Sequence, residues 1–315
     1  MTPGSPTKDL ILRKNQMVNN SKPKVLVLMA TYNGARYLQE QLDSITNQEG
    51  VDVHFLFCDD GSTDETLQIL KDFSGHWPVI DVLITERVGH PKAFSDLSLN
   101  CPLDFDFYAF SDQDDVWESR KLLESIGAFR DQNAKVVGTG RQILSQKKRL
   151  DSRVQMPHSP HFSNAIVQNI LFGNTCVINK VGLNFLRENL PDGLIHFDGW
   201  LYFIFSSCAE VEIIQKPLVK YRIHDANTLG IRKLSSFVKI QKQIKSYYFQ
   251  AKIGEKYVEK FCNQSDKELL FDFIEVFQEK RTFLKIPRLR NLDVRRAQKF
   301  DTFLFKVLIL FSVAE

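Results

Sequence analysis

Short apolar runs, each ended by polar residues, constrain the fold of this chain more than any other feature. The runs cover residues 25–30, 53–58, 79–84 and 105–110, and the first reads VLVLMA without interruption. Such runs are typical of strands that are buried on both faces of a sheet. Segments with apolar residues at helical spacing lie between them, so the first 140 residues predict alternating strands and helices around an open, mostly parallel sheet.

The helices are expected at definite positions. Residues 34–48 carry apolar side chains at helical spacing, and a second helix is expected to begin at Ser62 or Thr63, because Ser62 and Glu65 have the spacing of a capping box. The rest of the chain predicts further elements: strands near 136–139, 176–179 and 211–214, a helix over 200–207 and long helices after residue 230.

Polar clusters follow three of the apolar runs at the point where each run ends. They are Thr31-Tyr32-Asn33, Asp59-Asp60-Gly61 and the segment 111–115. In open α/β sheets, ligands bind beyond the carboxyl ends of the strands. The three clusters are therefore expected to form one site.

Three carboxylates crowd into the third cluster, as Asp112, Asp114 and Asp115. Carboxylates this close repel one another unless a cation neutralises them, and Mg²⁺ or Mn²⁺ prefers oxygen ligands together with substrate phosphates. The alternative is an acidic surface turn that caps a helix beginning near Glu118.

The first two clusters suit a nucleoside. A carboxylate such as Asp60 can accept hydrogen bonds from a base, Tyr32 can pack on a base, and Thr31 or Asn33 can bind a ribose. The alternatives are a helix cap at Asp59 or Asp60 and a simple turn in which Asn33 and the glycine after it take positive φ. The sequence has neither GxGxxG nor GxxxxGK[ST], which argues against a dinucleotide-binding or P-loop protein.

With these motifs the chain resembles the family 2 glycosyltransferases. The matching segments are ATYNG at 30–34, CDDGSTD at 58–64, SDQDD at 111–115, HFDGWL at 196–201 and YRIHDANTLG at 221–230, and the likeness covers about residues 24–230. SDQDDVW with the two later segments is most similar to the bacterial rhamnosyltransferase-like branch. The resemblance implies the glycosyltransferase A fold, a nucleotide-diphosphate sugar donor, a divalent cation and inversion at the anomeric carbon. The chain has no QxxRW motif of processive members, so one sugar per encounter is expected.

The resemblance also implies residue roles. These are nucleoside or donor contacts at Thr31, Tyr32, Asn33, Asp60, Lys92 and Asp112, metal ligands at Asp112, Asp114 and His224, sugar and acceptor contacts at Asp115, Gly173, Asn174, Thr175 and Trp200, and the catalytic base at Asp198.

The chemistry of inverting transfer agrees with two of these assignments. A cation at the aspartates would stabilise the charge that develops on the leaving diphosphate. Asp198 lies among aromatic and apolar residues, where desolvation would raise its basicity. The alternatives are a helix N-cap for Asp198 and a structural role for His224.

Charge is distributed unevenly between the two parts of the chain. Residues 231–315 hold 18 basic and 10 acidic residues in a protein whose overall formal charge is only +3, so a nucleic-acid partner is not expected. The end of this region, KFDTFLFKVLILF, is a candidate basic amphipathic helix for an anionic membrane surface. The alternatives are a helical cap on the catalytic domain and a homodimer contact.

The sequence shows no recognisable signal peptide and no apolar segment long enough to span a membrane. Residues 10–12 are too short an apolar run for a signal-peptide core, and residues 303–313 reach only about half of the roughly 20 residues that a membrane span needs. The five cysteines are far apart and lack a CxxC pair, which indicates buried thiols rather than disulfides or a zinc site. A cytoplasmic protein is expected, with the inner face of the cell membrane as its candidate location.

Together these observations predict three regions: a leader at 1–22, a catalytic domain at 23–230 and a basic helical region at 231–315. The predicted function is an inverting, metal-dependent glycosyltransferase of cell-envelope polysaccharide synthesis, with L-rhamnose from a dTDP donor as the candidate sugar and a saccharide or lipid-linked saccharide as acceptor. Two alternatives are a nucleotidyltransferase acting on sugar phosphates and a non-catalytic scaffold.

Overall fold

A computed structural model of the chain describes residues 21–129, 135–145, 160–208, 210–224, 237–296, 298–310 and 312. The predicted leader falls almost entirely outside these residues, as does the YRIHDANTLG segment after His224.

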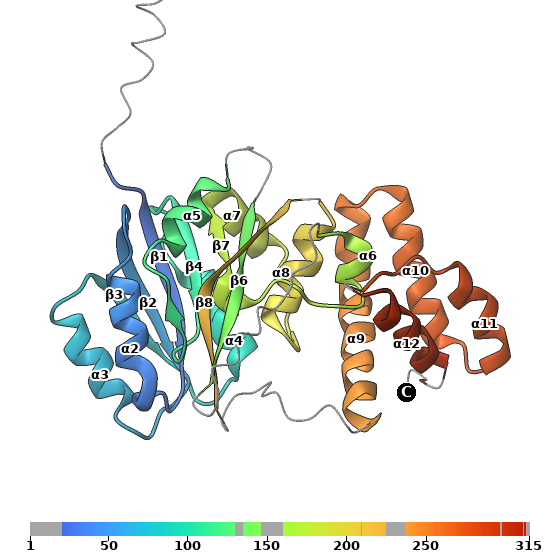
Figure 1. The fold of residues 1–315 in the computed structure, drawn as a ribbon, viewed down its shortest axis with the longest axis horizontal. Coiled ribbons are helices and arrows are strands. Elements are labelled where there is room, and N and C mark those ends of the chain that lie inside the picture. Colours follow the sequence, from blue (N-terminus) through green and yellow to red (C-terminus); the bar gives the residue numbers. More distant parts are fainter. Residues whose placement is uncertain are drawn as a thin grey trace, which may run out of the picture.

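The described strands form one mixed sheet in the order β3-β2-β1-β4-β7-β6-β8-β5 (Figure 1). Their bounds are β1 Lys24–Thr31, β2 Asp52–Asp59, β3 Val79–Ile84, β4 Phe107–Ser111, β5 Val116–Trp117, β6 Val136–Ser145, β7 Val177–Asn179 and β8 Val211–Ile223. The first four strands of the order run parallel, whereas β7 is antiparallel to both of its neighbours and β5 is antiparallel to β8. The prediction of a mostly parallel α/β sheet is confirmed.

Helices cover both faces of this sheet, and further helices follow it. Their bounds are α2 Ala35–Thr46, α3 Thr66–Ser74, α4 His90–Asn100, α5 Lys121–Gly127, α6 Phe162–Ala165, the 3₁₀ helix η1 Gly173–Thr175, α7 Lys180–Glu188, α8 Phe197–Ser206, α9 Phe237–Phe261, α10 Gln264–Gln278, α11 Thr282–Asn291 and α12 Lys299–Leu310.

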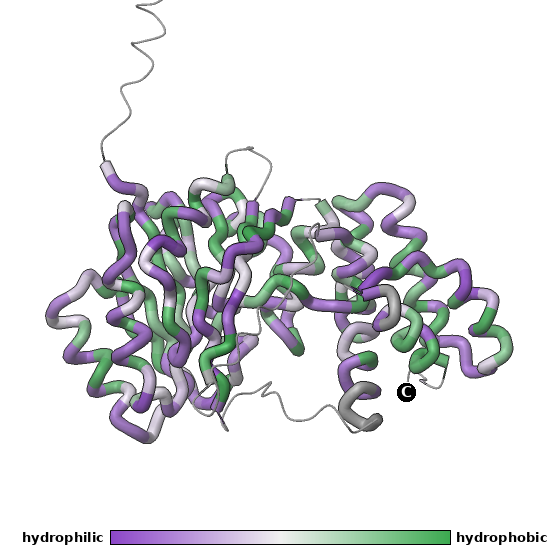
Figure 2. The backbone as a smooth tube through the Cα atoms, in the orientation of Figure 1, coloured by the Kyte–Doolittle hydropathy of each residue, from purple (hydrophilic) through white to green (hydrophobic). Residues whose placement is uncertain are grey.

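Strand β1 shows why the central strands read as continuous apolar runs. Val25 and Val27 pack with Leu38 and Leu42 of α2 on one face, whereas Leu28 belongs to the apolar cluster on the other face. Because successive side chains of a strand point to opposite faces, a strand covered on both sides needs apolar residues at every position. Figure 2 shows such apolar stretches on the strands and again within the C-terminal helices.

The C-terminal helices pack against α8, which belongs to the predicted catalytic domain. Tyr248 of α9 and Phe273 of α10 belong to the same buried cluster as Trp200 and Phe203 of α8. Figure 1 shows α9–α12 as a helical layer beyond α8, at the end of the molecule opposite β3. The helical-cap alternative for this region is confirmed. Within the part of the chain that the structure describes, no helix is both long enough and apolar enough to cross a bilayer.

Candidate functional site

The register of the parallel strands brings the predicted polar clusters to one edge of the sheet. Thr31 at the end of β1 is paired with Asp59 at the end of β2, and Met29 of β1 is paired with Ser111 at the end of β4. The three clusters therefore lie side by side beyond the carboxyl ends of neighbouring strands, as the sequence predicts.

A buried carboxylate organises the turn after β2. Asp59 accepts hydrogen bonds from the Thr31 hydroxyl at 2.8 Å and from the Ser62 hydroxyl at 2.6 Å and backbone N–H at 2.8 Å. The Ser62 side chain therefore binds within this turn, and α3 begins four residues later at Thr66 without a side-chain cap. The capping box predicted for Ser62 and Glu65 is wrong for this reason.

Asp60 holds the segment that leads from β3 into α4. Its carboxylate accepts hydrogen bonds from the Thr85 hydroxyl at 2.9 Å, from the Val88 N–H at 2.6 Å and from the Gly89 N–H at 2.8 Å. Neither Asp60 nor its neighbour caps α3, so the helix-cap alternative is wrong. The donors leave part of the carboxylate's accepting capacity unused, because two carboxylate oxygens offer about four acceptor sites.

Tyr32 presents an aromatic ring beside these carboxylates. The ring is 38% exposed, and the Arg87 guanidinium carbon lies 5.4 Å from its centroid. The Gln113 side chain holds the tyrosine backbone by two hydrogen bonds of 2.8 Å, one from the Tyr32 N–H and one to the Tyr32 carbonyl. Asn33 takes the positive φ expected for the turn, 47°, whereas the positive φ expected at Gly34 is wrong, because Gly34 has a φ of −100°. The side-chain oxygen of Asn33 accepts a hydrogen bond from the Thr63 N–H at 2.8 Å.

Two histidines meet the aspartate cluster. Nε2 of His224 lies 2.7 Å from Oδ2 of Asp114, and Nε2 of His90 lies 3.0 Å from Oδ1 of Asp112. The structure thus brings His224 to the predicted metal motif from 110 residues away. Lys92, predicted to approach the donor, forms an ion pair with Asp96 on its own helix.

The electrostatics of this cluster favour a cation. Burial raises the pKa of Asp114, the charge of Asp112 raises it further, and His224 lowers it. Mutual repulsion between neighbouring carboxylates is what a bound divalent cation relieves. Among the described residues, however, no three His, Cys, Asp or Glu side chains form a complete metal cage. The set fits a cation such as Mg²⁺, which is commonly held by one or two carboxylates and completed by substrate phosphates and water.

The acidic cluster does not cap a helix. It is followed by β5, and α5 begins only at Lys121, with Arg120 at its N-cap position. The alternative of a helix-capping acidic turn is therefore wrong.

Asp115 supports the site from inside the protein. Its carboxylate is fully buried and accepts hydrogen bonds from the Asn174 side-chain amide and from the Arg222 N–H, the latter at 3.0 Å. The predicted contact of Asp115 with the sugar is wrong for this structure, because its side chain has no exposed surface and its oxygens bind η1 and β8.

Asp198 reaches the same edge from the first turn of α8. The N-cap position belongs to His196, and the Asp198 carboxylate accepts a hydrogen bond from the Gly199 N–H at 2.8 Å, so the N-cap alternative is wrong. Burial raises the pKa of Asp198, and the nearby positive charges of His90 and His196 lower it. The negative charge of Asp112 also acts on it, so the candidate base and the aspartate cluster lie within electrostatic reach of each other.

The loop at η1 packs on the candidate base. A Cβ atom at Gly173 would lie 3.5 Å from Cβ of Asp198. The Asn174 side chain is buried against Asp115, and the buried Thr175 hydroxyl donates to the Phe172 carbonyl at 2.7 Å, so neither side chain is presented to a sugar as predicted. Trp200 has 0% exposure, and its indole N–H donates to the Asn189 carbonyl at 3.0 Å. Trp200 is therefore a core residue, and the prediction that it faces the sugar is wrong.

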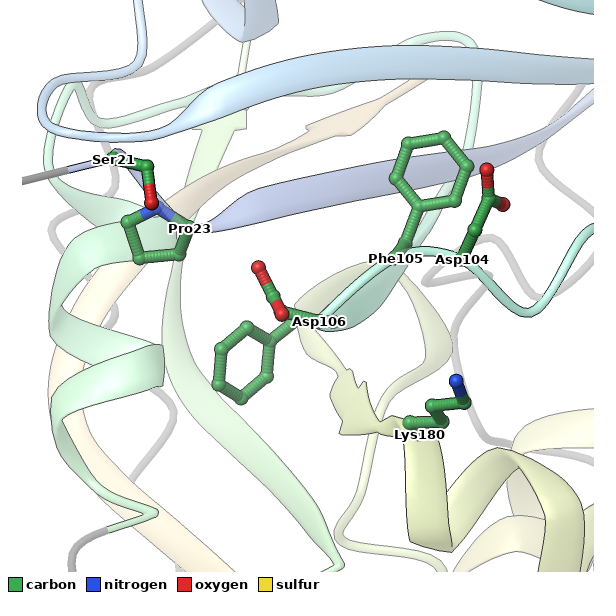
Figure 3. Close-up of a pocket in the computed structure, with 7 residues that line it drawn as sticks. Ser21, Pro23, Asp104, Phe105, Asp106 and Lys180 are labelled. Carbon is green, nitrogen blue, oxygen red and sulfur yellow. The ribbon is translucent and has the colours of Figure 1, made fainter. Parts of the chain in front are cut away.

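One hollow on the surface lies away from this site. It is bounded by Pro23, Asp106 and Lys180, which lie at the amino ends of β1 and β4 and at the start of α7 (Figure 3). Because the polar clusters follow the carboxyl ends of the same strands, the hollow lies at the opposite edge of the sheet and has no part in the candidate site.

Three residues of the site were not predicted from the sequence. His90 belongs to the GHPKAF segment, in which only Lys92 was assigned. Gln113 stands between two aspartates and holds Tyr32. Arg222 donates from Nε to the Asp114 carbonyl at 2.9 Å and from Nη2 to Glu40 at 2.6 Å. The position of Gln113 between two aspartates of the cluster was the available signal for that residue, whereas no element was predicted at His90 that could have indicated its role.

Comparison with known proteins identifies the family of this chain. The model named Glycosyl transferase family 2 matches residues 26–190, which include the three polar clusters. The chain belongs to glycosyltransferase family 2. It is 32% identical over 218 residues to the dTDP-rhamnosyl transferase RfbG of Shigella flexneri, an alignment that spans 64% of this chain and 73% of the relative.

Solved glycosyltransferase structures share the fold at low sequence identity. S. aureus TarS in complex with UDP-GlcNAc is 16% identical, with a TM-score of 0.57 over 86% of this chain and 79% of that one. The mannosyltransferase PcManGT from Pyrobaculum calidifontis, in complex with GDP-Man and Mn²⁺, is 14% identical, with a TM-score of 0.55 over 90% and 79%. The glycosyltransferase A fold is confirmed, and the family assignment replaces the nucleotidyltransferase and scaffold alternatives.

Proposed function

We propose that this glycosyltransferase transfers a sugar from a nucleotide diphosphate to an acceptor hydroxyl with inversion, assisted by a divalent cation. One observation supports the proposal most directly. Asp198 comes from a segment 84 residues after Asp114, yet the ring of Phe197 beside it lies 5.1 Å from the ring of Phe110, which comes just before the aspartate cluster, and burial raises the pKa of Asp198. A base on one side of a donor site and a cation-binding cluster on the other are the two groups that inverting transfer needs.

In the proposed reaction, Asp198 accepts the proton of the acceptor hydroxyl as its oxygen forms a bond to the anomeric carbon. The bond between that carbon and the diphosphate breaks on the opposite face, and the nucleoside diphosphate leaves with the electron pair. The raised pKa of Asp198 suits a base, because a carboxylate with a higher pKa binds the proton more strongly.

Asp112 and Asp114 would hold the divalent cation, with His224 beside Asp114. When bound, such a cation supplies positive charge for the leaving diphosphate. Tyr32, Asn33 and Asp60 would contact the nucleoside, with the exposed Tyr32 ring as the stacking surface, whereas the buried Thr31 hydroxyl, which donates to Asp59, would support the turn from inside the protein. Lys92 and Gly173 stay predicted donor and sugar contacts.

We further propose dTDP-L-rhamnose as the donor, because the relative at 32% identity is named a dTDP-rhamnosyl transferase. The test is thermal unfolding with dTDP, UDP, GDP, CDP and ADP, each with Mn²⁺, with Mg²⁺ and with neither. Ligands that bind the native state raise the melting temperature by mass action. A cation-dependent rise that is largest for dTDP is expected, and folded protein whose melting temperature no nucleotide changes at millimolar concentration would refute the proposal.

For the acceptor we propose a lipid-linked saccharide at an anionic membrane surface. The support lies on α11 and α12, where the buried Lys285 ammonium of α11 donates to the carbonyl oxygen of Ile309 in α12 and to that of Ser312 just after it. These helices expose large apolar side chains at Phe283, Leu284, Ile286, Phe303 and Leu304. The exposed cations Lys280, Arg281 and Arg290 lie on the same helices or directly before them. Exposed apolar side chains beside basic ones are typical of segments that enter the headgroup layer.

Vesicle sedimentation tests the membrane contact. Phe303→Ser is preferred to truncation because Phe305 and Ile309 of α12 are buried, so deletion would damage the core. The control Val181→Ser removes a side chain of similar exposure, 62% against 64%, on the distant helix α7. We expect binding to phosphatidylglycerol vesicles to weaken for Phe303→Ser and to stay unchanged for Val181→Ser. Equal binding of both variants and the wild type would exclude the α12 surface.

A further inference from the structure

Arg141 is a cation at the candidate site that the proposed function has not yet used. It lies on β6, beyond the residues of that strand that pair with β7, and it is in register with Val219 of β8. Its guanidinium carbon lies 3.4 Å from the centroid of the Phe172 ring and 4.4 Å from that of the Tyr221 ring. Two aromatic rings therefore fix the position of the guanidinium plane.

The two aromatic residues connect Arg141 to the rest of the site. Phe172 directly precedes Gly173, which packs on Asp198, and Tyr221 directly precedes Arg222, whose N–H binds Asp115. Burial lowers the pKa of Arg141, and the negative charges of Asp115, Asp198 and Asp112 act in the opposite direction. Arg141 thus lies within electrostatic reach of both the candidate base and the cation-binding cluster.

The hydrogen-bonding capacity of this guanidinium is not used up inside the protein. Its Nε atom is buried and has no hydrogen-bond partner among the described residues, and Arg141 forms no ion pair with any carboxylate that the structure describes. An arginine has five N–H donors, and leaving a buried donor unpaired is unfavourable. A protein that keeps such a cation at the rim of its active site has a donor set available for a ligand.

We propose that Arg141 binds a phosphate group of a substrate, an inference that rests on the proposed function. The fork of N–H donors on a guanidinium matches the oxygens of a phosphate, and a phosphate would fill the donors that the protein leaves unpaired. The phosphate has two possible sources. It is either the diphosphate of the sugar nucleotide or the diphosphate that links an acceptor saccharide to its lipid.

The test uses Arg141→Met and Arg141→Lys in the full chain. Methionine keeps an unbranched apolar stem against Phe172 and Tyr221, and lysine keeps the charge but loses the fork. Arg120→Met, on the exposed N-cap residue of α5, is the control. Urea unfolding first establishes which variants are folded, and calorimetry with Mn²⁺ then measures the affinity for dTDP, dTMP, inorganic pyrophosphate and farnesyl diphosphate.

The expected result is a loss of at least tenfold in pyrophosphate affinity for Arg141→Met, a smaller loss for Arg141→Lys and none for Arg120→Met. If the donor supplies the phosphate, dTDP affinity falls in the same order while dTMP affinity stays within twofold. If the acceptor supplies it, farnesyl diphosphate affinity falls and dTDP affinity does not.

Failure of the proposed donor and failure of the proposed phosphate contact give different results. Wild-type protein that binds no nucleoside diphosphate but loses pyrophosphate affinity with Arg141→Met would refute the proposed donor and retain the phosphate contact. A folded Arg141→Met variant that binds all four probes within twofold of wild type would overturn the phosphate contact, and Arg141 would then act only in packing the two rings.

Discussion

The contact between Gly34 and Gln113 gives a sharp test of how the nucleoside side of the site is built. A Cβ atom at position 34 would lie 2.0 Å from Oε1 and 2.3 Å from Cδ of Gln113. Gly34→Ala must therefore displace the Gln113 amide and break both of its hydrogen bonds to the Tyr32 backbone. Backbone strain is not the cause, because Gly34 has a φ of −100° and a ψ of 2°, which alanine can adopt.

The cost can be estimated from the lost contacts. Each of the two hydrogen bonds contributes about 1 kcal/mol net, so their loss costs about 2 kcal/mol. Alanine is also a poorer N-cap residue than glycine, which adds about 0.5–1 kcal/mol at the start of α2. Gly34→Ala is therefore expected to lower the free energy of unfolding by about 3 kcal/mol.

A double-mutant cycle separates the clash from the cap. In a Gln113→Ala background the clashing amide is absent, so adding Gly34→Ala should cost only about 0.5–1 kcal/mol, a coupling of about 2 kcal/mol. Urea unfolding measures the four free energies, and dTDP titration follows the same four proteins. If Gly34→Ala costs the same in both backgrounds, the Gln113 clamp does not organise this turn and the reasoning fails.

Three further outcomes are expected. Asp198→Asn should keep dTDP affinity and lower kcat by about 10²–10⁴-fold, and unchanged transfer by this variant would identify another base. Because burial raises the pKa of Asp198, wild-type kcat/KM should fall on acidification at a pH above the ordinary aspartate pKa of about 4. Asp114→Asn should abolish the Mn²⁺-dependent part of dTDP affinity, and full retention of it would remove Asp114 from the metal site. Burial lowers the pKa of Lys121 to about 7 from 10.5, so between these pH values the unfolded chain binds more protons and stability rises with pH. Lys121→Met should therefore be more stable than wild type at pH 7.5, and its advantage should shrink by about 1.4 kcal/mol per pH unit toward pH 10; an advantage that does not change with pH would contradict this.

The sequence predicts the strands of the front half well, because their signal is local. Residues 79–84 are the exact bounds of β3, and the ends of β1 and β2 fall within a residue or two of their apolar runs. The same locality explains the convergence of the polar clusters, since parallel neighbours end at one edge of the sheet. Strand β8 was predicted only over 211–214, because Lys216, Pro217 and Lys220 interrupt its later apolar pattern.

Contacts between distant segments account for what the sequence did not predict. Ser62 has the spacing of a capping residue, and only its partners Asp59 and Asn33 show that it belongs to a turn. Trp200 follows the candidate base in sequence, yet helical geometry turns it into the core against Phe203 and Tyr257. Arg141 is one basic residue just beyond the strand expected at 136–139, and nothing nearby in the sequence indicates that Phe172 and Tyr221 pack on it.

Asp115 explains how such distant segments are assembled into one site. Its buried carboxylate binds Asn174 of η1 and the backbone of Arg222 on β8, and burial with the charges of Asp112 and Asp114 raises its pKa well above the ordinary value. Arg222 in turn donates to the Asp114 carbonyl, and the strand continues to His224 beside the Asp114 carboxylate. The third aspartate of the cluster thus joins the loop next to the candidate base to the strand that carries the histidine. Because this carboxylate is used inside the protein, the cation-binding role that we propose belongs to Asp112 and Asp114, and the positions of both depend on a residue that need not touch any substrate.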